Sequence, residues 1–363
     1  MLPVIGTAHS RVMHELDVLA ARARNGLRYM AGVQLGKIAA TPREPVWSRD
    51  KVVLYRYTNE DAPSRRTPIL LVMSLVTRPY VFDLRPGSSL VEDLKGAGYD
   101  VFLLDWGVPD AVESQNTLET YCDEYIPRAA NAVLRTSGAD RLTLFSYCFG
   151  AVLSLISVAA HPGLPVENMV VMATPVDLSR LGPLANMMSE GRLEPDDLFD
   201  ETGNVPASTI LDGFRLMNPM SELLTLANLW RSLTDERALA AHQALIGWAN
   251  EQIPLPGAVF RQFIHLFLRR QLLMKGRVPL ADREVELARI SCPVLNVLGD
   301  RDTLVPPESS APLPDALSGV DVETLRLPAG HAGLFVGREA RKKCVPAIIS
   351  WLDQRESSRR PVT

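Results

Sequence analysis

Runs of consecutive apolar residues alternate with longer amphipathic stretches along much of this chain. Four apolar runs of strand length lie at residues 68–75, 100–106, 142–145 and 169–173. Such runs are typical of strands buried on both faces of a parallel sheet, because covering helices leave them no solvated face. A helix is expected between two of them, over residues 118–136. This βαβα alternation predicts an α/β fold whose mostly parallel sheet is flanked by helices.

The first part of the chain predicts an amphipathic helix over residues 8–36. Its apolar residues fall near one face, at Val12, Leu16, Leu19, Leu27, Met30 and Val33. This face either packs on the body of the protein or docks a partner, and the pattern leaves both open. A first strand is expected at residues 52–57, so that residues 1–45 form an N-terminal helical segment.

The strand and helix alternation stops after residue 175. Residues 176–288 contain Leu-, Met- and Trp-rich helical segments and no strand of the buried kind. The sheet pattern then resumes with two strands and a closing helix, at residues 293–298, 322–327 and 338–353. We therefore expect one α/β core, built from residues 46–175 and 289–356, with a helical cap insertion at 176–288.

The candidate chemistry begins between residues 141 and 161. A strand-like run passes through SYCFG at residues 146–150 into a helical run. A strand, a tight turn and a helix form a nucleophile elbow, in which the residues two before and two after the nucleophile must be small. Ser146 and Gly150 fill these places around Cys148, so we expect Cys148 to be the nucleophile.

Two other interpretations of this stretch exist. Residues 142–160 carry no charge and are long enough for a membrane helix. Gly150, the hydroxyl residues and the change of period favour a buried strand and helix instead, so no transmembrane segment is expected. The alternative for Cys148 is an ordinary core cysteine, since free cysteine is among the most buried residue types. Partner residues elsewhere in the chain favour the catalytic interpretation.

Composition narrows the class of protein. With 363 residues, of which 47% are hydrophobic and 22% charged, the chain can form one large domain with an insertion, or two domains. Its net charge of −4 gives no electrostatic case for binding nucleic acid. The four cysteines show no CxxC pair and no metal-ligand spacing, which indicates a reduced, cytoplasmic protein without a metal site. The N-terminus reaches charged residues before an apolar signal segment can form.

A base and an acid for the thiol are expected on loops that follow late strands. Of six histidines, His331 alone lies on such a loop, flanked by glycines. The loop after the strand at 293–298 supplies Asp300 and Asp302, and we favour Asp302 because it follows a glycine by three residues and precedes an apolar pair. The order Cys148, Asp302, His331 is the nucleophile, acid and base order of α/β-hydrolases.

The tetrahedral intermediate needs backbone donors for its oxyanion. The first is expected to be the N–H of Phe149, directly after the nucleophile. The second is expected from the loop after the strand at 68–75, at Val76 or Thr77, and the sequence does not choose between them.

With these residues in place, the chain resembles the catalytic subunit of class III polyhydroxyalkanoate (poly(3-hydroxybutyrate)) synthases of the α/β-hydrolase superfamily. The resemblance runs over nearly the whole length, at residues 50–57, 75–84, 100–110, 146–150, 172–178, 203–206, 292–307 and 329–333. The family box is usually Gly-x-Cys-x-Gly-Gly, and here Ser146 and Ala151 take its outer positions. Phe149 and Thr77 also replace polar residues of the family pattern, which bears on substrate preference more than on the fold.

The resemblance implies an acyltransferase without a cofactor, which polymerises (R)-3-hydroxyacyl-CoA, with 3-hydroxybutyryl-CoA as the expected substrate. Cys148 would carry the acyl group as a thioester, His331 would deprotonate the thiol, and Asp302 would be the partner of the histidine. Contacts with the substrate are expected from Arg78, Tyr80 and Trp248.

The apolar insertion is expected to keep water away from the acyl-enzyme. The side chains for this role are Leu211, Phe214, Leu216, Met217, Leu223, Leu224, Leu226, Leu229, Trp230 and Trp248. Because such a cap must move to admit CoA, we expect a closed resting form that opens on binding a second synthase subunit or on homodimerisation. The resemblance also implies a cytoplasmic location at polyester granules.

Two other functions remain open at this point. One is a thiol hydrolase of the thioesterase or dienelactone hydrolase type, in which water replaces the hydroxyl acceptor. The other is a non-catalytic subunit that keeps the fold and binds a hydrophobic granule.

Overall fold

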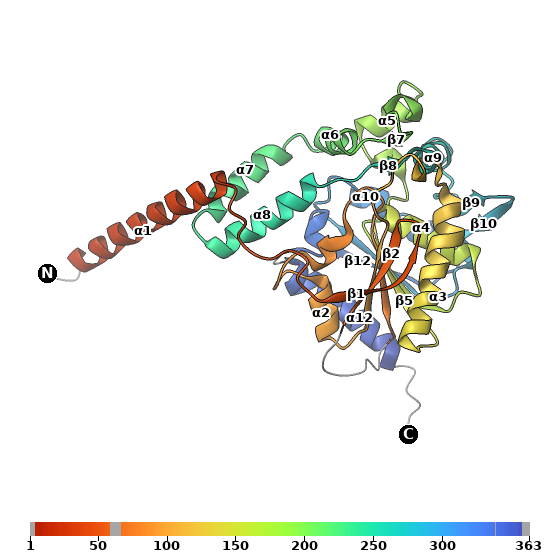
Figure 1. The fold of residues 1–363 in the computed structure, drawn as a ribbon, viewed down its shortest axis with the longest axis horizontal. Helices are drawn as coiled ribbons and strands as arrows, with labels where there is room; N and C mark the ends of the chain where they lie inside the picture. Colours follow the sequence, from red (N-terminus) through yellow and green to blue (C-terminus); the bar gives the residue numbers. More distant parts are fainter. Residues whose placement is uncertain (1–3, 59–66, 338, 358–363) are drawn as a thin grey trace.

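The computed structural model describes residues 4–58, 67–337 and 339–357, and its centre is an eight-stranded sheet (Figure 1). The strands are β1 Arg43–Arg49, β2 Val52–Tyr57, β3 Ile69–Val72, β4 Val101–Asp105, β5 Leu142–Tyr147, β6 Val166–Met172, β11 Val294–Gly299 and β12 Val322–Leu327. Their order in the sheet is β1-β2-β4-β3-β5-β6-β11-β12. β1 pairs with β2 and β2 with β4 in antiparallel fashion, and the other neighbours are parallel. The predicted mostly parallel sheet is confirmed.

Helices cover both faces of the sheet. They are α2 Leu90–Gly96, α3 Ile126–Ser137, α4 Phe149–Ala160 and α12 Val345–Ser357. Along β3, Leu70 and Val72 belong to the hydrophobic core shared with α3 and α4, whereas Ile69 and Leu71 belong to the core shared with α2 and α12. Successive side chains of a strand point to opposite faces, which explains why these strands appear in the sequence as unbroken apolar runs.

The edge of the sheet departs from the expectation. β1 was not predicted, and the predicted end of the N-terminal helical segment, at residue 45, falls inside this strand. The reason is that β1 is an edge strand, REPVWSR, with no fully buried residue and charged residues at both ends. The closing helix was expected from Arg338, which lies outside the described residues. The described part is a π-helical turn, Ala340–Cys344, followed by α12.

Residues 176–288 contain the expected helices together with four short strands. The helices are α5 Pro183–Ser189, α6 Ala207–Met217, α7 Ser221–Ser232, α8 Glu236–Asn250 and α9 Gly257–Gln262. β7 Asn204–Val205 pairs with β8 Leu255–Pro256, and β9 Arg277–Leu280 pairs with β10 Arg283–Glu286. The expectation of an insertion without buried strands is therefore wrong at β7 and β8, which are buried but too short to show a period.

The N-terminal helix α1, Val4–Met30, projects away from the sheet, and its C-terminal part lies beside α7 and α8 (Figure 1). It ends six residues before the predicted residue 36, where Gly32 (φ 68°) and Gly36 (φ 126°) adopt backbone conformations that break a helix. Five apolar residues of the helix predicted at 8–36 are exposed: Leu16, Leu19, Leu27, Met30 and, beyond the end of α1, Val33. Packing of this face on the body, one of the two alternatives, is wrong for these residues. Within the described ranges, no helix combines the length and apolar character needed to cross a membrane.

Candidate active site

Cys148 occupies the tight turn between β5 and α4. Its backbone has φ 53° and ψ −125°, in the left-handed region that non-glycine residues rarely adopt, and its N–H donates to the Met172 carbonyl at 2.8 Å. Strain of this kind costs on the order of 1–3 kcal/mol and persists where the surrounding structure imposes it. The turn lifts residue 148 out of the strand and places it directly before the N-terminus of α4.

Small residues around the thiol let the backbone turn. A Cβ atom on Gly150 would overlap the Met73 carbonyl and lie 2.8 Å from the Val72 carbonyl oxygen, so α4 can begin this close to β3 only with glycine. Ser146, which takes the place of a family glycine, is fully buried, and its Oγ is 2.7 Å from Oγ of Ser154. The turn therefore accommodates this departure with a buried hydrogen bond.

His331 and Asp302 meet on neighbouring loops. Asp302 follows β11 and His331 follows β12, and these strands are parallel neighbours. Nδ1 of His331 is 2.6 Å from Oδ2 of Asp302, while Oδ1 of Asp302 accepts the N–H groups of Leu304 at 3.0 Å and Val305 at 2.9 Å. These bonds satisfy both oxygens of a fully buried carboxylate, as an ionised acid requires. Asp300 instead pairs with Arg326 at the surface.

The environment of His331 favours its protonated form. Burial lowers the pKa of the imidazole, but the charge of Asp302 and hydrogen bonds with Asp302 and Cys148 outweigh burial and raise the pKa to about 10. The structure thus brings all three residues of the expected triad together. An imidazolium beside a cysteine favours the thiolate, which is the nucleophilic form.

The other three cysteines lie in a different environment. All are buried, and burial raises the pKa well above its ordinary value for Cys122, to about 11 for Cys292 and to about 12 for Cys344. Cys148 is only half-buried. Among the described residues, no cluster of His, Cys, Asp and Glu side chains could hold a metal ion.

The residues expected to bind the oxyanion flank the elbow. Phe149 is the first residue of α4, where a backbone N–H has no partner within the helix. β3 pairs with β5 so that Val72 lies opposite Ser146, and the loop with Val76 and Thr77 leaves the sheet beside the elbow. The Val76 carbonyl accepts the N–H of Ile253 at 3.0 Å.

The three residues expected to contact the substrate form one group. Trp248 is buried and its Nε1–H donates to the Arg78 carbonyl at 2.9 Å. The Tyr80 hydroxyl donates to Glu251 at 2.7 Å, and Arg78 lies 3.5 Å from the same carboxylate. Sequence reasoning missed Glu251, because its only signal was a polar NEQ segment after the apolar helix α8.

The side chains expected to exclude water from the thiol are only partly buried. Of the side chains assigned to exclude water, several are exposed: Leu216, Leu223, Leu224, Leu226 and Trp230. α7 buries none of its residues, and it extends from the body toward α1 (Figure 1). The α7 part of the insertion therefore does not provide the expected water-excluding cover, and the closed resting form stays a prediction. Apolar residues at helical spacing predict an apolar face, but the pattern does not show what that face contacts.

The sheet order and the cysteine elbow define an α/β-hydrolase. The family described as the alpha/beta hydrolase fold matches residues 81–337. A solved hydrolase from Pseudomonas aeruginosa PA01 is similar with a TM-score of 0.52 and 18% identity, over 86% of this chain and 99% of that one. A carboxylesterase from Nitrososphaera gargenis is similar with a TM-score of 0.50 and 13% identity, over 87% and 100%. At these identities the likeness shows the fold alone, and the predicted fold is confirmed.

Curated relatives narrow the class further. The poly(3-hydroxyalkanoate) polymerase subunit PhaC of Allochromatium vinosum is 34% identical over 350 residues, covering 95% of this chain and 98% of that protein. PhaC of Thiocystis violacea is 32% identical over 349 residues, covering 95% and 97%. PhaC of Cupriavidus necator is 24% identical over 313 residues, covering 84% and 53%. The chain belongs to the family of poly(3-hydroxyalkanoate) polymerase subunits, and the resemblance inferred from the motifs is confirmed.

Proposed function

We propose that the protein polymerises (R)-3-hydroxyacyl-CoA, with 3-hydroxybutyryl-CoA as its main substrate, into polyester with release of CoA. Membership of the polymerase subunit family supports the reaction class. The observation that carries the mechanism is His331, whose Nδ1 lies 2.6 Å from Oδ2 of the buried Asp302 and whose imidazole interacts with Cys148. This arrangement couples a thiol to a base that is itself held by a buried acid.

Each proton in the proposed reaction has a defined destination. The Cys148 thiolate attacks the thioester carbonyl, and backbone N–H groups of Phe149 and of Val76 or Thr77 hold the oxyanion. The C–S bond to CoA then breaks, and the His331 imidazolium gives its proton to the leaving thiolate. Neutral His331 next accepts the proton of the 3-hydroxyl group of an incoming 3-hydroxyacyl-CoA, whose oxygen attacks the acyl-cysteine. The acyl C–S bond breaks, and Cys148 leaves as the thiolate, which can attack the CoA thioester of the lengthened chain. Asp302 stabilises the imidazolium that forms again.

The test follows both products of the reaction. The protein is incubated with (R)-3-hydroxybutyryl-CoA while free CoA and insoluble polyester are measured. We expect both products from the wild-type chain and from Cys122→Ala, Cys292→Ala and Cys344→Ala, because these thiols are buried with raised pKa values. Cys148→Ala should release no CoA. Undiminished CoA release by Cys148→Ala would contradict the proposal. It would mean that the elbow around Cys148 has no catalytic role.

A thiol hydrolase remains the second candidate because water can approach the site. Cys148 is half-buried, and α7 buries none of its residues. An acyl-enzyme that meets water is hydrolysed instead of passing its acyl group to a hydroxyl. In that case the same incubation gives free (R)-3-hydroxybutyrate and no insoluble polymer.

We also propose that the chain works in the cytoplasm in a hetero-oligomer with a second synthase subunit, forms homodimers, and sits at the polyester granule surface. The exposed apolar side chains of α1 and α7 support this proposal, because contiguous exposed apolar surface commonly marks an interaction site.

A further inference from the structure

The end of helix α8 is joined to the loop that follows β3. Ile253 N–H donates to the Val76 carbonyl at 3.0 Å, and Trp248 Nε1–H donates to the Arg78 carbonyl at 2.9 Å. Between these two bonds, Thr77 forms an isolated antiparallel bridge with Gln252. Residues 248–253 of the insertion therefore hold residues 76–78 from one side.

These bonds fix the orientation of the loop backbone. A trans peptide is planar, so the Val76 carbonyl and the Thr77 N–H lie in one plane and point in opposite directions. Because Ile253 holds that carbonyl, it also sets the direction of the Thr77 N–H. The bond from Trp248 fixes the plane of the next peptide, Arg78–Pro79, which carries no N–H.

Glu251 adds side-chain contacts to the same junction. One carboxylate oxygen accepts the Tyr80 hydroxyl at 2.7 Å, and the other lies 3.5 Å from Nε of Arg78. Its side chain is 51% exposed, and an exposed pair of this kind contributes little to global stability. Its contacts nevertheless reach the loop at Arg78 and at Tyr80, on both sides of Pro79.

We propose that Glu251 is a positioning residue, which acts through Tyr80 and Arg78 to hold the 76–80 loop in the orientation that presents its N–H to the oxyanion. This role rests on the proposed function. It also reassigns Arg78, Tyr80 and Trp248 from contact with the substrate to support of the loop. Their polar groups already bond to one another and to Glu251.

The role predicts that two reactions of Cys148 respond differently. Attack on a thioester creates an oxyanion and needs the loop donor. Alkylation by iodoacetamide displaces iodide at a saturated carbon, forms no oxyanion and depends on the thiolate alone. A residue that only stabilises the fold would lower both rates together.

The experiment compares carboxylates at the two ends of α8. In Glu251→Ala, we expect the rate of thioester loss from (R)-3-hydroxybutyryl-CoA to fall about tenfold, because a loosened donor loses part of its oxyanion stabilisation. Alkylation of the Cys148 peptide, followed by mass spectrometry, should stay within about twofold of wild type. The control is Glu236→Ala at the other end of the helix, since Glu236 is equally exposed, at 53%, and pairs with Arg28. It should leave both rates unchanged.

A second variant tests whether Glu251 acts through Tyr80. Tyr80→Phe removes the hydroxyl that Glu251 accepts, so it should lower thioester attack without changing alkylation. The double variant should lose no more than Glu251→Ala alone. If Glu251→Ala lowered both rates equally, or left thioester attack unchanged, the positioning role would be overturned. The proposed function would still stand in that case, provided that the wild-type chain releases CoA. A wild-type chain that releases no CoA would overturn both.

Discussion

Asp302 is the residue on which the chemistry of His331 depends most. Its carboxylate is buried, accepts two backbone N–H groups and lies 2.6 Å from the imidazole. In Asp302→Asn, the charge that raises the pKa of His331 is lost, and the amide can hold the wrong tautomer of the ring. We expect CoA release to fall by about a hundredfold or more, measured as the initial rate with (R)-3-hydroxybutyryl-CoA.

Asp300 provides the matched control for this substitution. It lies two residues away, is exposed and pairs with Arg326 at 2.7 Å. Asp300→Asn should therefore keep near-normal CoA release and stability. If Asp300→Asn were the more damaging of the two changes, the assignment of the acid would be wrong.

The raised pKa of His331 also makes stability depend on pH. The pKa rises from 6.5 to about 10 on folding, so the folded chain binds more protons over this range. The ionised pair's contribution to the free energy of unfolding is fully present below pH 6.5, and it is lost as the pH rises through the folded-state pKa of about 10. Urea unfolding at several pH values should show a steeper loss of stability for wild type than for His331→Gln between these limits. Parallel profiles would contradict the paired imidazolium.

At this scale, the sequence predicted the triad because each member follows a strand of recognisable pattern. Asp302 was distinguished from Asp300 by its place after a glycine, and the structure has Asp302 facing His331. Glu251 was missed because it acts across the fold on Tyr80, which is 171 residues away, and no local period reports such a contact. The sequence did not choose between Val76 and Thr77 as the second oxyanion donor, because this choice also depends on contacts across the fold.

Among the elements, α1 is the one whose attachment is easiest to test. Asn25 is fully buried, and its side-chain amide donates to the Leu233 carbonyl at the end of α7 at 2.8 Å. Asn25→Ala leaves this carbonyl without that donor, which costs about 1–3 kcal/mol. We expect faster hydrogen exchange in α1 and at the end of α7, with the sheet strands unaffected.

The control for this change is Arg24→Ala on the exposed side of the same helix. Alanine is at least as good a helix former as arginine, so exchange in α1 should stay as in wild type. Slower or unchanged exchange in Asn25→Ala would show that α1 is held by other contacts.

The elements differ in how far their sequence determines them. Buried parallel strands such as β3 are apolar on both faces, so their sequence already specifies their place in the sheet. The edge strand β1 and the short pair of β7 and β8 depend on partners that lie elsewhere in the chain. α7 gives a third case, since its apolar face was predicted but its exposure was not.

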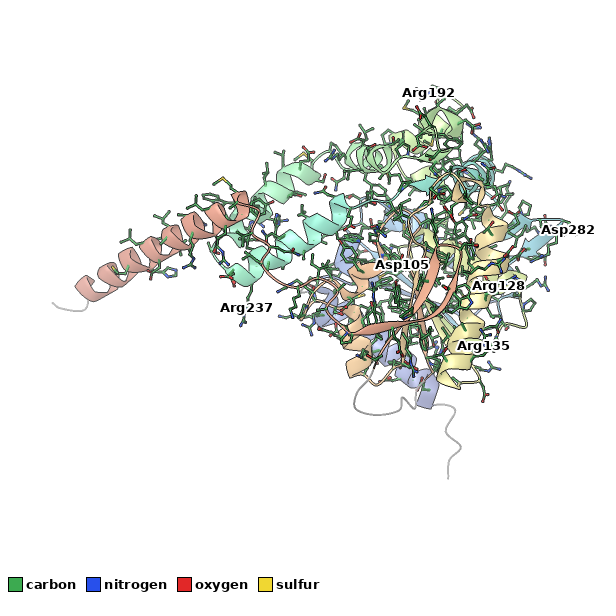
Figure 2. All side chains as sticks on the ribbon, viewed as in Figure 1. Asp105, Arg128, Arg135, Arg192, Arg237 and Asp282 are labelled. Carbon is green, nitrogen blue, oxygen red and sulfur yellow. The ribbon has the colours of Figure 1, made fainter. Side chains whose placement is uncertain are left out.

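The molecule as a whole has two unlike surfaces. On the body, the outer face of α3 carries Arg128 and Arg135, as Figure 2 shows, and such charged faces are ordinary solvated surface. On the part of α1 that projects beyond α7 and α8, side chains extend without a neighbouring element (Figure 2). Along the helix, Leu16, Leu19 and Leu27 are 53%, 56% and 65% exposed. This contrast supports the proposal that α1 contacts another subunit.

Replacing the exposed leucines tests that assembly. In the triple variant Leu16→Gln, Leu19→Gln and Leu27→Gln, the helix should persist because glutamine is a good helix former. Self-association, measured by sedimentation velocity, should weaken relative to wild type because apolar contact area is lost. The control, Arg128→Gln with Arg135→Gln, should sediment as wild type. Unchanged sedimentation of the leucine variant would mean that α1 does not form the interface.

The central claim is that the acyl group passes through the sulfur of Cys148. Its most direct test is mass spectrometry of the protein quenched in acid during turnover of (R)-3-hydroxybutyryl-CoA and then digested. We expect one or more 3-hydroxybutyryl units on the peptide that contains Cys148, and none in Cys148→Ala. Acyl groups on another residue, or CoA release with no acyl-peptide in rapidly quenched samples, would contradict it.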